Sequence, residues 1–207
     1  MPPARLLTAF PTFPGNTFLG YAMPDPEPPI VKKRQGVLWG KSPDHFRGRE
    51  AAILAVAKVA TLHSTLPRPP SPALRNADIV WRGHLDAGSW RSLLRESKFL
   101  LGLGDPLLGP SAVDAVAAGC AYVDVIYDKP KKLVYASQHP FVAAAFAGTP
   151  YYCAARAGDA RAFADCARAA ADGPELAPRA VPELALDAHA ARVARIFGAF
   201  LPNRTAR

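Results

Sequence analysis

The residues best suited to chemistry lie in a glycine- and proline-rich stretch, GLGDPLLGP, at residues 102–110. An apolar run precedes it, and a run of helical composition begins at Pro110 or Ser111. Glycine lets a backbone approach a ligand closely, and the first N–H groups of a helix favour an anion. Gly104 and Pro110 are therefore candidates for contact with a diphosphate. The spacing is neither GxGxxG nor a P-loop, so a plain tight turn is an equal alternative.

Asp114 lies one turn into the helix expected after this loop. Its carboxylate could accept hydrogen bonds from both hydroxyls of a ribose. An acid in a first helical turn also interacts favourably with the helix dipole, and on local grounds that interpretation is the favoured one.

Two lysines and a histidine complete the candidate site. Lys41 follows an apolar run that ends at Gly40, and Lys129 follows a later one, so both are expected at the carboxyl edge of a sheet. There they could neutralise a diphosphate, although most lysines are solvated surface groups. His139 either caps a helix that begins near Pro140 or contacts the ligand. A catalytic role for it is a minor interpretation, because no nucleophile or acid accompanies it in sequence.

The remaining reactive side chains indicate no metal site. Cys120, Cys153 and Cys166 have neither CxxC nor Cys/His zinc spacing, and the sequence does not indicate which of them pair. His63 falls within a long run of helical composition, about residues 44–66, and is expected to pack on its apolar face.

Strand-like and helical segments alternate along the rest of the chain. An alternation of this kind predicts a Rossmann-like α/β fold, with a parallel sheet covered by helices on both faces. Prolines recur through residues 1–35, which predicts a lead-in or connector before a single domain of residues 36–207. The expected strands are residues 37–39, 79–81, 98–103, 121–126 and 151–153, and the expected helices are residues 44–66, 86–96, 110–119, 159–172 and 185–200.

Composition fits a packed domain with anionic partners. Half of the 207 residues are apolar, and the formal charge is +8. The cations are scattered, so nucleic acid is not strongly indicated; a basic nucleic-acid-binding domain is an alternative that predicts strongly salt-dependent binding. No apolar run is long enough for a membrane span or a secretory signal.

Several passages resemble the C-terminal, donor-binding half of the alpha-1,6-mannosylglycoprotein 6-beta-N-acetylglucosaminyltransferases, also called N-acetylglucosaminyltransferase V. The resemblance spans residues 10–201, and its central passage is long and ungapped. The passages are FPTFPGNTFLGY, VLWGKSPDHF, LRESKFLLGLGDPLLGPSAVDAVAAGCAYV, SQHP and ELALDAHAARVARIFGAFL.

This resemblance implies the C-terminal domain of a GT-B glycosyltransferase, in which two Rossmann-like domains face each other across a cleft. The implied activity is inverting transfer of N-acetylglucosamine from UDP-GlcNAc to the α1,6-linked mannose of N-glycans, in β1,6 linkage, in the Golgi, with no metal or other cofactor. Asp114 falls on a family glutamate expected to hold the ribose. Lys129 falls on a family lysine near the diphosphate.

The chain also departs from this family. Asp114 is one methylene shorter than glutamate, and the loop before Lys129 is shorter than in the family. The catalytic base and the membrane anchor are expected on N-terminal parts that these 207 residues do not include. A catalytically silent UDP-sugar-binding fragment is therefore the alternative to an active transferase.

Overall fold

The computed structural model describes residues 7–9, 17–103, 110–127 and 140–198. Its contacts divide the chain into two compact units, residues 26–179 and residues 1–25 together with 180–207. The sequence-based boundary between residues 35 and 36 stays a prediction.

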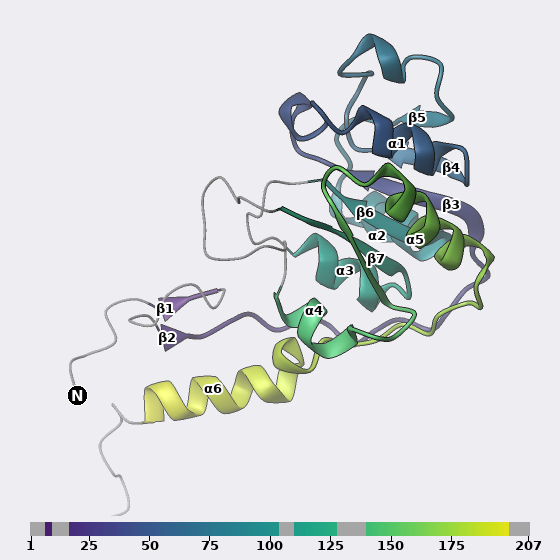
Figure 1. The fold of residues 1–207 in the computed structure, drawn as a ribbon. Coiled ribbons are helices and arrows are strands. Elements are labelled where there is room, and N and C mark those ends of the chain that lie inside the picture. The colour runs from purple at the N-terminus through teal and green to yellow at the C-terminus, as the bar shows by residue number, and fades with distance from the viewer. Residues whose placement is uncertain (1–6, 10–16, 104–109, 128–139, 199–207) are drawn as a thin grey trace, which may run out of the picture. The chain divides into compact units, whose positions relative to one another are not determined.

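The unit of residues 26–179 is built on a parallel sheet of six strands in the order β5-β4-β3-β6-β7-β8 (Figure 1). Every neighbouring pair in this sheet is parallel, so the predicted Rossmann-like fold is confirmed. The strands are β3 (Lys33–Trp39), β4 (Thr61–Ser64), β5 (Ile79–Trp81), β6 (Ser97–Gly102), β7 (Ala121–Ile126) and β8 (Tyr152–Arg156).

Helices cover both faces of this sheet, as Figure 1 shows. On one face α1 (Glu50–Ala57) packs against α5 (Ala160–Asp172), and on the other α2 (Ala87–Glu96) lies beside α3 (Ser111–Ala117), which contacts α4 (Pro140–Phe146). The central strands β6 and β7 are almost entirely buried, as expected of parallel strands with helices on both faces. Leu38, Phe99 and Val123 belong to the core under α1 and α5.

Helix boundaries follow capping signals in the sequence. Asp86 is the N-cap of α2, where its carboxylate accepts a hydrogen bond from the Ser89 N–H at 2.8 Å. Gly119, the last residue of the expected helix of residues 110–119, follows α3 with a φ of +73°. Asp159 caps α5 by accepting from the Ala162 N–H at 2.9 Å.

One predicted helix is wrong in its second half. The run of residues 44–66 forms the 3-10 turn Pro43–His45 and α1, but then turns into β4. The helix ends at Ala57, and backbone pairing with β3 and β5 makes residues 61–64 a strand instead. Tertiary pairing here overrides local propensity.

In the described part of the smaller unit, two short strands pair in parallel, and the 3-10 turn Pro182–Leu184 precedes an α-helix. Strands β1 (Leu7–Thr8) and β2 (Thr17–Phe18) pair, and α6 spans Leu186–Gly198. The Arg192 guanidinium of α6 lies 4.8 Å from the centre of the Phe18 ring, and its Nε–H donates to the Leu19 carbonyl at 2.9 Å. These two contacts hold α6 against the segment that follows β2.

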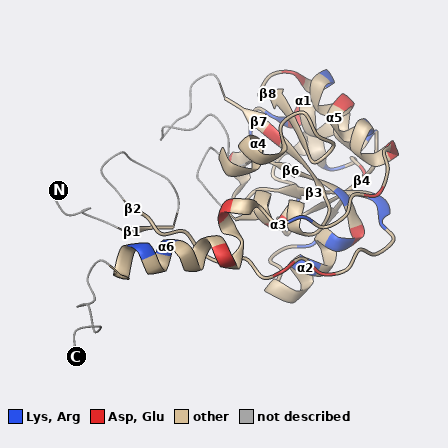
Figure 2. Ribbon diagram, turned by 90° about the horizontal axis from the view of Figure 1, so that it is seen from below, with Lys and Arg blue, Asp and Glu red and all other residues tan. Residues whose placement is uncertain are grey.

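Charged residues are mixed in sign over the described helices and strands (Figure 2). Helix α6, for example, has Asp187 in its first turn and Arg195 in its last, as its dipole favours. Among the described helices, none is long and apolar enough to cross a membrane.

A buried lysine joins the sheet to α2 and α3. Lys32 is only 8% exposed, just before β3. Its ammonium donates to the carbonyls of Arg95 and Ala118, both at 2.8 Å, and of Ser97 at 3.0 Å. Arg95 is in the last turn of α2 and Ala118 is the C-cap of α3, so one cation satisfies the carboxyl ends of two helices.

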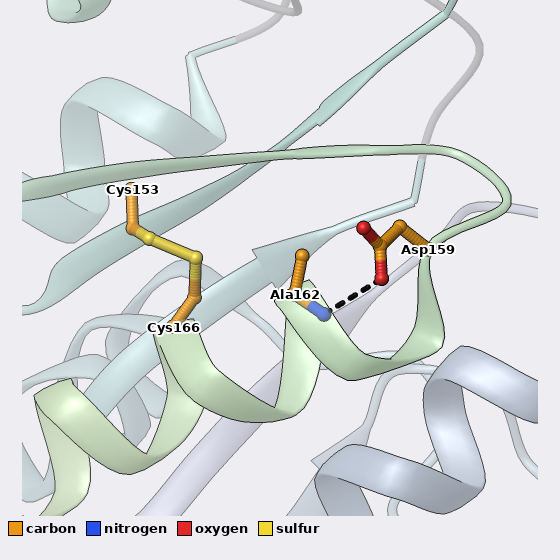
Figure 3. The surroundings of a disulfide bond; sticks show 4 residues. All are labelled: Cys153, Asp159, Ala162 and Cys166. Atoms are coloured by element: carbon orange, nitrogen blue, oxygen red, sulfur yellow. Dashed lines mark hydrogen bonds between the residues drawn. A yellow bond between two sulfur atoms is a disulfide. The ribbon is translucent and has the colours of Figure 1, made fainter.

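A disulfide ties the edge strand β8 to α5. It joins Cys153 to Cys166, with their Cα atoms 5.8 Å apart, and so fixes the pairing that the sequence left open (Figure 3). Cys120 is a buried free thiol beside the ammonium of Lys32, and burial raises its pKa to about 11. The disulfide secures the edge of the sheet to the helix layer.

Replacing Lys32 with alanine should lower the free energy of unfolding by about 3 kcal/mol, because it leaves several buried carbonyls without a donor. Chemical denaturation measures the loss. Lys33→Ala is the matched control: Lys33 is exposed and its partner Glu96 is a surface carboxylate, so a change below about 1 kcal/mol is expected. Equal losses for the two variants would show that Lys32 does not have this role.

Replacing Cys153 and Cys166 together with alanine should cost about 3 kcal/mol of stability, because the crosslink closes a loop with a sequence separation of 13 residues. Urea unfolding with and without dithiothreitol measures the effect. The reductant should destabilise the native protein by a similar amount and leave the double variant unchanged. If dithiothreitol did not change the unfolding free energy of the native protein, the stabilising role of the disulfide would be contradicted.

Candidate functional site

A pocket of about 790 Å³ opens at the carboxyl ends of the first three strands of the large unit. Segments after β3, β4 and β5 contribute to it, and so do the first turns of α2 and α3. Its lining residues are Trp39, Gly40, Lys41, Thr65, Leu66, Pro67, His84, Leu85, Trp90, Pro110, Ser111 and Asp114.

Strand order explains why the pocket forms here. From β3 the chain proceeds outward through β4 to β5, then returns to β6 on the other side of β3. The two connections leave β3 and β6 in opposite directions, so helices do not cover the carboxyl ends of these strands. Doubly wound sheets bind ligands in the crevice at this switch point.

The close approach of backbones at the pocket depends on Gly40. A Cβ atom built on it would lie 2.6 Å from Cε2 of Phe46, a ring that is fully buried. The Gly40 carbonyl accepts a hydrogen bond from the Thr65 hydroxyl at 3.3 Å. A side chain at residue 40 would therefore displace the segment that carries Lys41.

Asp114 is anchored to the neighbouring helix. The indole N–H of Trp90, in the first turn of α2, donates to Oδ2 of Asp114 at 3.0 Å. Both side chains are half-buried and both line the pocket. The carboxylate is thus held in a defined orientation at the pocket wall.

Burial raises the pKa of Asp114, because a carboxylate loses hydration in this wall. The Trp90 hydrogen bond and the charge of Arg91 act in the opposite direction, since both favour the ionised form. A half-buried acid with a perturbed pKa in a cleft is typical of a functional site.

Lys41 supplies a cation at the same pocket. Its side chain is exposed, and its Nζ lies 5.6 Å from the centre of the Trp39 ring. The backbone N–H of Lys41 donates to Nδ1 of His45 at 3.1 Å, which orders the turn after β3. The pocket is therefore lined by an acid, Asp114, and by the long, exposed side chain of a cation, Lys41.

The structure brings three of the sequence-predicted site residues to this pocket: Lys41, Pro110 and Asp114. Gly104, Lys129 and His139 lie outside the described residues. The ligand-binding roles of all six stay predictions.

Sequence reasoning missed most of the pocket lining. Thr65, Leu66 and Pro67 were missed because β4 was interpreted as part of a helix, and their position after a strand end was hidden. Trp90 was missed because it lies within the expected helix of residues 86–96, where an apolar side chain by itself indicates no site. In an α/β unit, however, α2 and α3 both begin at the carboxyl edge of the sheet, so an indole in one first turn and a carboxylate in the other could have been paired.

His63 is buried as expected, but on a strand and not on a helix. It lies in β4, where its Nδ1 accepts a hydrogen bond from the Arg82 Nε–H at 2.7 Å. Burial and the Arg82 charge lower its pKa, so the neutral ring is favoured. His63 is absent from the pocket lining and is a structural residue.

The fold is of the Rossmann-like α/β class, with a pocket at the switch point of its sheet. The sequence profile of glycosyltransferase family 18 matches residues 1–168 of this chain. The chain belongs to this family, which confirms the resemblance found in the sequence.

Curated relatives are similar at low identity. Alpha-1,6-mannosylglycoprotein 6-beta-N-acetylglucosaminyltransferase B of Mus musculus is 27% identical over 176 residues, which cover 72% of this chain and 22% of the relative. Enzyme A of Homo sapiens is 26% identical over 172 residues, covering 72% and 23%. The chain thus spans less than a quarter of the length of these relatives.

Among solved structures, the calicheamicin glycosyltransferase CalG4 is similar, with a TM-score of 0.49 and 16% identity over 94% of this chain and 49% of CalG4. Within the described part of the chain, no group of three or more His, Cys, Asp or Glu side chains is arranged to hold a metal ion.

Replacing Asp114 with asparagine should stabilise the fold at neutral pH. The folded-state pKa is raised, so ionising Asp114 costs stability as the pH rises from the unfolded value, about 4, through the folded one. The gain should shrink as the pH falls toward 4. Urea unfolding at pH 7 and pH 4 measures it.

Asp86→Asn is the control of opposite sign. The Ser89 N–H lowers the pKa of Asp86, so its charge stabilises the folded state above its unfolded pKa, and that stability is lost as the pH falls. Loss of stability at pH 7 in the Asp114 variant would refute the assigned direction.

Proposed function

We propose that this chain is the donor-binding half of a GT-B glycosyltransferase and binds UDP-GlcNAc in the pocket at the switch point. The observation that carries the proposal is that Asp114 and Lys41 both line one cleft, in a chain of glycosyltransferase family 18. A carboxylate recognises vicinal hydroxyls, and a cation neutralises a diphosphate. The pocket volume of about 790 Å³ suits a ligand of nucleotide size.

In this proposal each polar residue serves one part of the donor. Asp114 accepts hydrogen bonds from the ribose hydroxyls, and Lys41 lies near the diphosphate. Lys129 joins Lys41 there, with Gly104, Pro110 and His139 contributing to the surrounding loops. Two lysines would then supply the positive charge that a metal ion supplies in other glycosyltransferases, so donor binding needs no metal.

The complete enzyme would transfer N-acetylglucosamine with inversion to the 6-hydroxyl of the α1,6-linked mannose of an N-glycan. A base on an acceptor domain takes the hydroxyl proton as the oxygen attacks the anomeric carbon. The bond from that carbon to the β-phosphate oxygen breaks, and its electron pair leaves with UDP. Lys41 and Lys129 stabilise the charge that develops on the phosphate.

The proposed location is the Golgi lumen. The relatives are glycoprotein N-acetylglucosaminyltransferases by name, and the Cys153–Cys166 disulfide suits an oxidising compartment.

Calorimetry with UDP and UDP-GlcNAc tests the proposal. Both should bind, with an affinity that EDTA does not change. Asp114→Asn should weaken UDP about 10- to 100-fold, because hydrogen bonds to a charged acceptor are lost. Lys41→Ala and Lys129→Ala should weaken UDP more than uridine, because uridine lacks the diphosphate.

Two outcomes separate the alternatives. A folded protein that gives no heat with UDP or UDP-GlcNAc would overturn the proposal. Binding without transfer to an N-glycan that exposes the α1,6-linked mannose would favour the catalytically silent UDP-sugar-binding module.

A further inference from the structure

The Trp90–Asp114 pair joins two helices at the wall of the pocket. Trp90 is in the first turn of α2, and Asp114 is in the first turn of α3. The two helices pack side by side on the same face of the sheet (Figure 1). The 3.0 Å hydrogen bond from the indole Nε1 to Oδ2 therefore spans the helix interface at the pocket.

The chemistry of the pair restricts the carboxylate in two ways. An indole N–H only donates, so Oδ2 must act as an acceptor and cannot present an O–H toward Trp90. The bond also fixes the rotation of the carboxylate about its last side-chain torsion. An ionised carboxylate has about four acceptor positions, so lone pairs on both oxygens remain for a ligand.

We propose that Trp90 is a positioning residue for ribose recognition: it holds Asp114 as an oriented acceptor that binds the ribose hydroxyls. This inference rests on the proposed function, since it assumes a nucleotide in this pocket. It adds a residue to which neither the family resemblance nor the pocket alone gives a role.

The short side chain of Asp114 is a physical reason for such an anchor. An aspartate has fewer rotamers but also less reach, so a small error in its orientation moves its oxygens out of hydrogen-bonding distance of the ribose. The Trp90 bond removes that freedom before the ligand arrives.

One charged group also influences the ionisation of Asp114: Arg91, beside Trp90 on α2, favours the carboxylate. Lys41 and His84 line the same pocket. Burial raises the pKa of Asp114, and the hydrogen bond from the indole N–H lowers it. Removing that N–H therefore raises the pKa, so that on acidification nucleotide binding is lost at a higher pH.

The test compares Trp90→Phe with Trp81→Phe. Both replace an indole by a phenyl ring, but Trp81 lies outside the pocket lining and packs against Phe46. Affinities for UDP and 2′-deoxy-UDP are measured by calorimetry between pH 5 and 8. The native protein should prefer UDP by about 10-fold, as expected for a hydrogen bond to a charged group.

We expect Trp90→Phe to weaken UDP about 10-fold, to leave 2′-deoxy-UDP nearly unchanged, and to lose binding at a higher pH than the native protein. Trp81→Phe should keep the native preference. A Trp90→Phe protein that keeps the preference for UDP would overturn the inference. A native protein that does not bind UDP would instead overturn the proposed function.

A measurement on the native protein removes any dependence on the folding of the variant. The chain has three tryptophans, so its ¹⁵N spectrum has three indole signals, and Asp114→Asn identifies the one from Trp90. UDP should shift this signal strongly, and 2′-deoxy-UDP should shift it less. Equal shifts with both nucleotides would contradict the inference.

Discussion

The arrangement of the large unit depends on the buried ammonium of Lys32. Parallel sheets place the carboxyl ends of their covering helices at the edge opposite the ligand, where unpaired carbonyls need donors. Lys32 satisfies Arg95, Ser97 and Ala118 at once, and so joins α2, α3 and the start of β6. Because both helices are rigid, their amino ends are fixed as well.

The amino ends of the same two helices carry Trp90 and Asp114. A hydrogen bond of 3.0 Å between side chains of different helices tolerates little movement, so the site requires the registration that Lys32 provides at the far edge. The contacts of Lys32 that stabilise the helices and the candidate site therefore lie at opposite edges of the sheet. Because the helices are held at one edge, the loops at the other edge can shape the pocket without disturbing them.

Strand and helix alternation was sufficient to predict the Rossmann-like fold, because buried parallel strands and capped helices have strong local signals. Asp86 and Gly119 lie at the limits of the expected helices of residues 86–96 and 110–119, and in the structure they lie at the ends of α2 and α3. The strand β4 was missed because its four residues follow a helix with no Gly or Pro between them, and only its pairing with β3 and β5 makes it a strand. The cysteine pairing was likewise not predictable, since it depends on the contact of β8 with α5.

The candidate site was predicted only in part for a related reason. Lys41 and Asp114 follow strand ends that the sequence reveals, whereas Trp90 is joined to the pocket acid by a hydrogen bond between residues 24 apart in sequence. Burial of Asp114 also disfavours its charged form, which is the form that the proposed ribose contact requires. A neutral residue in that wall would avoid this cost, so the proposed contact with a ligand gives a reason for a carboxylate beside an indole donor that the fold alone does not.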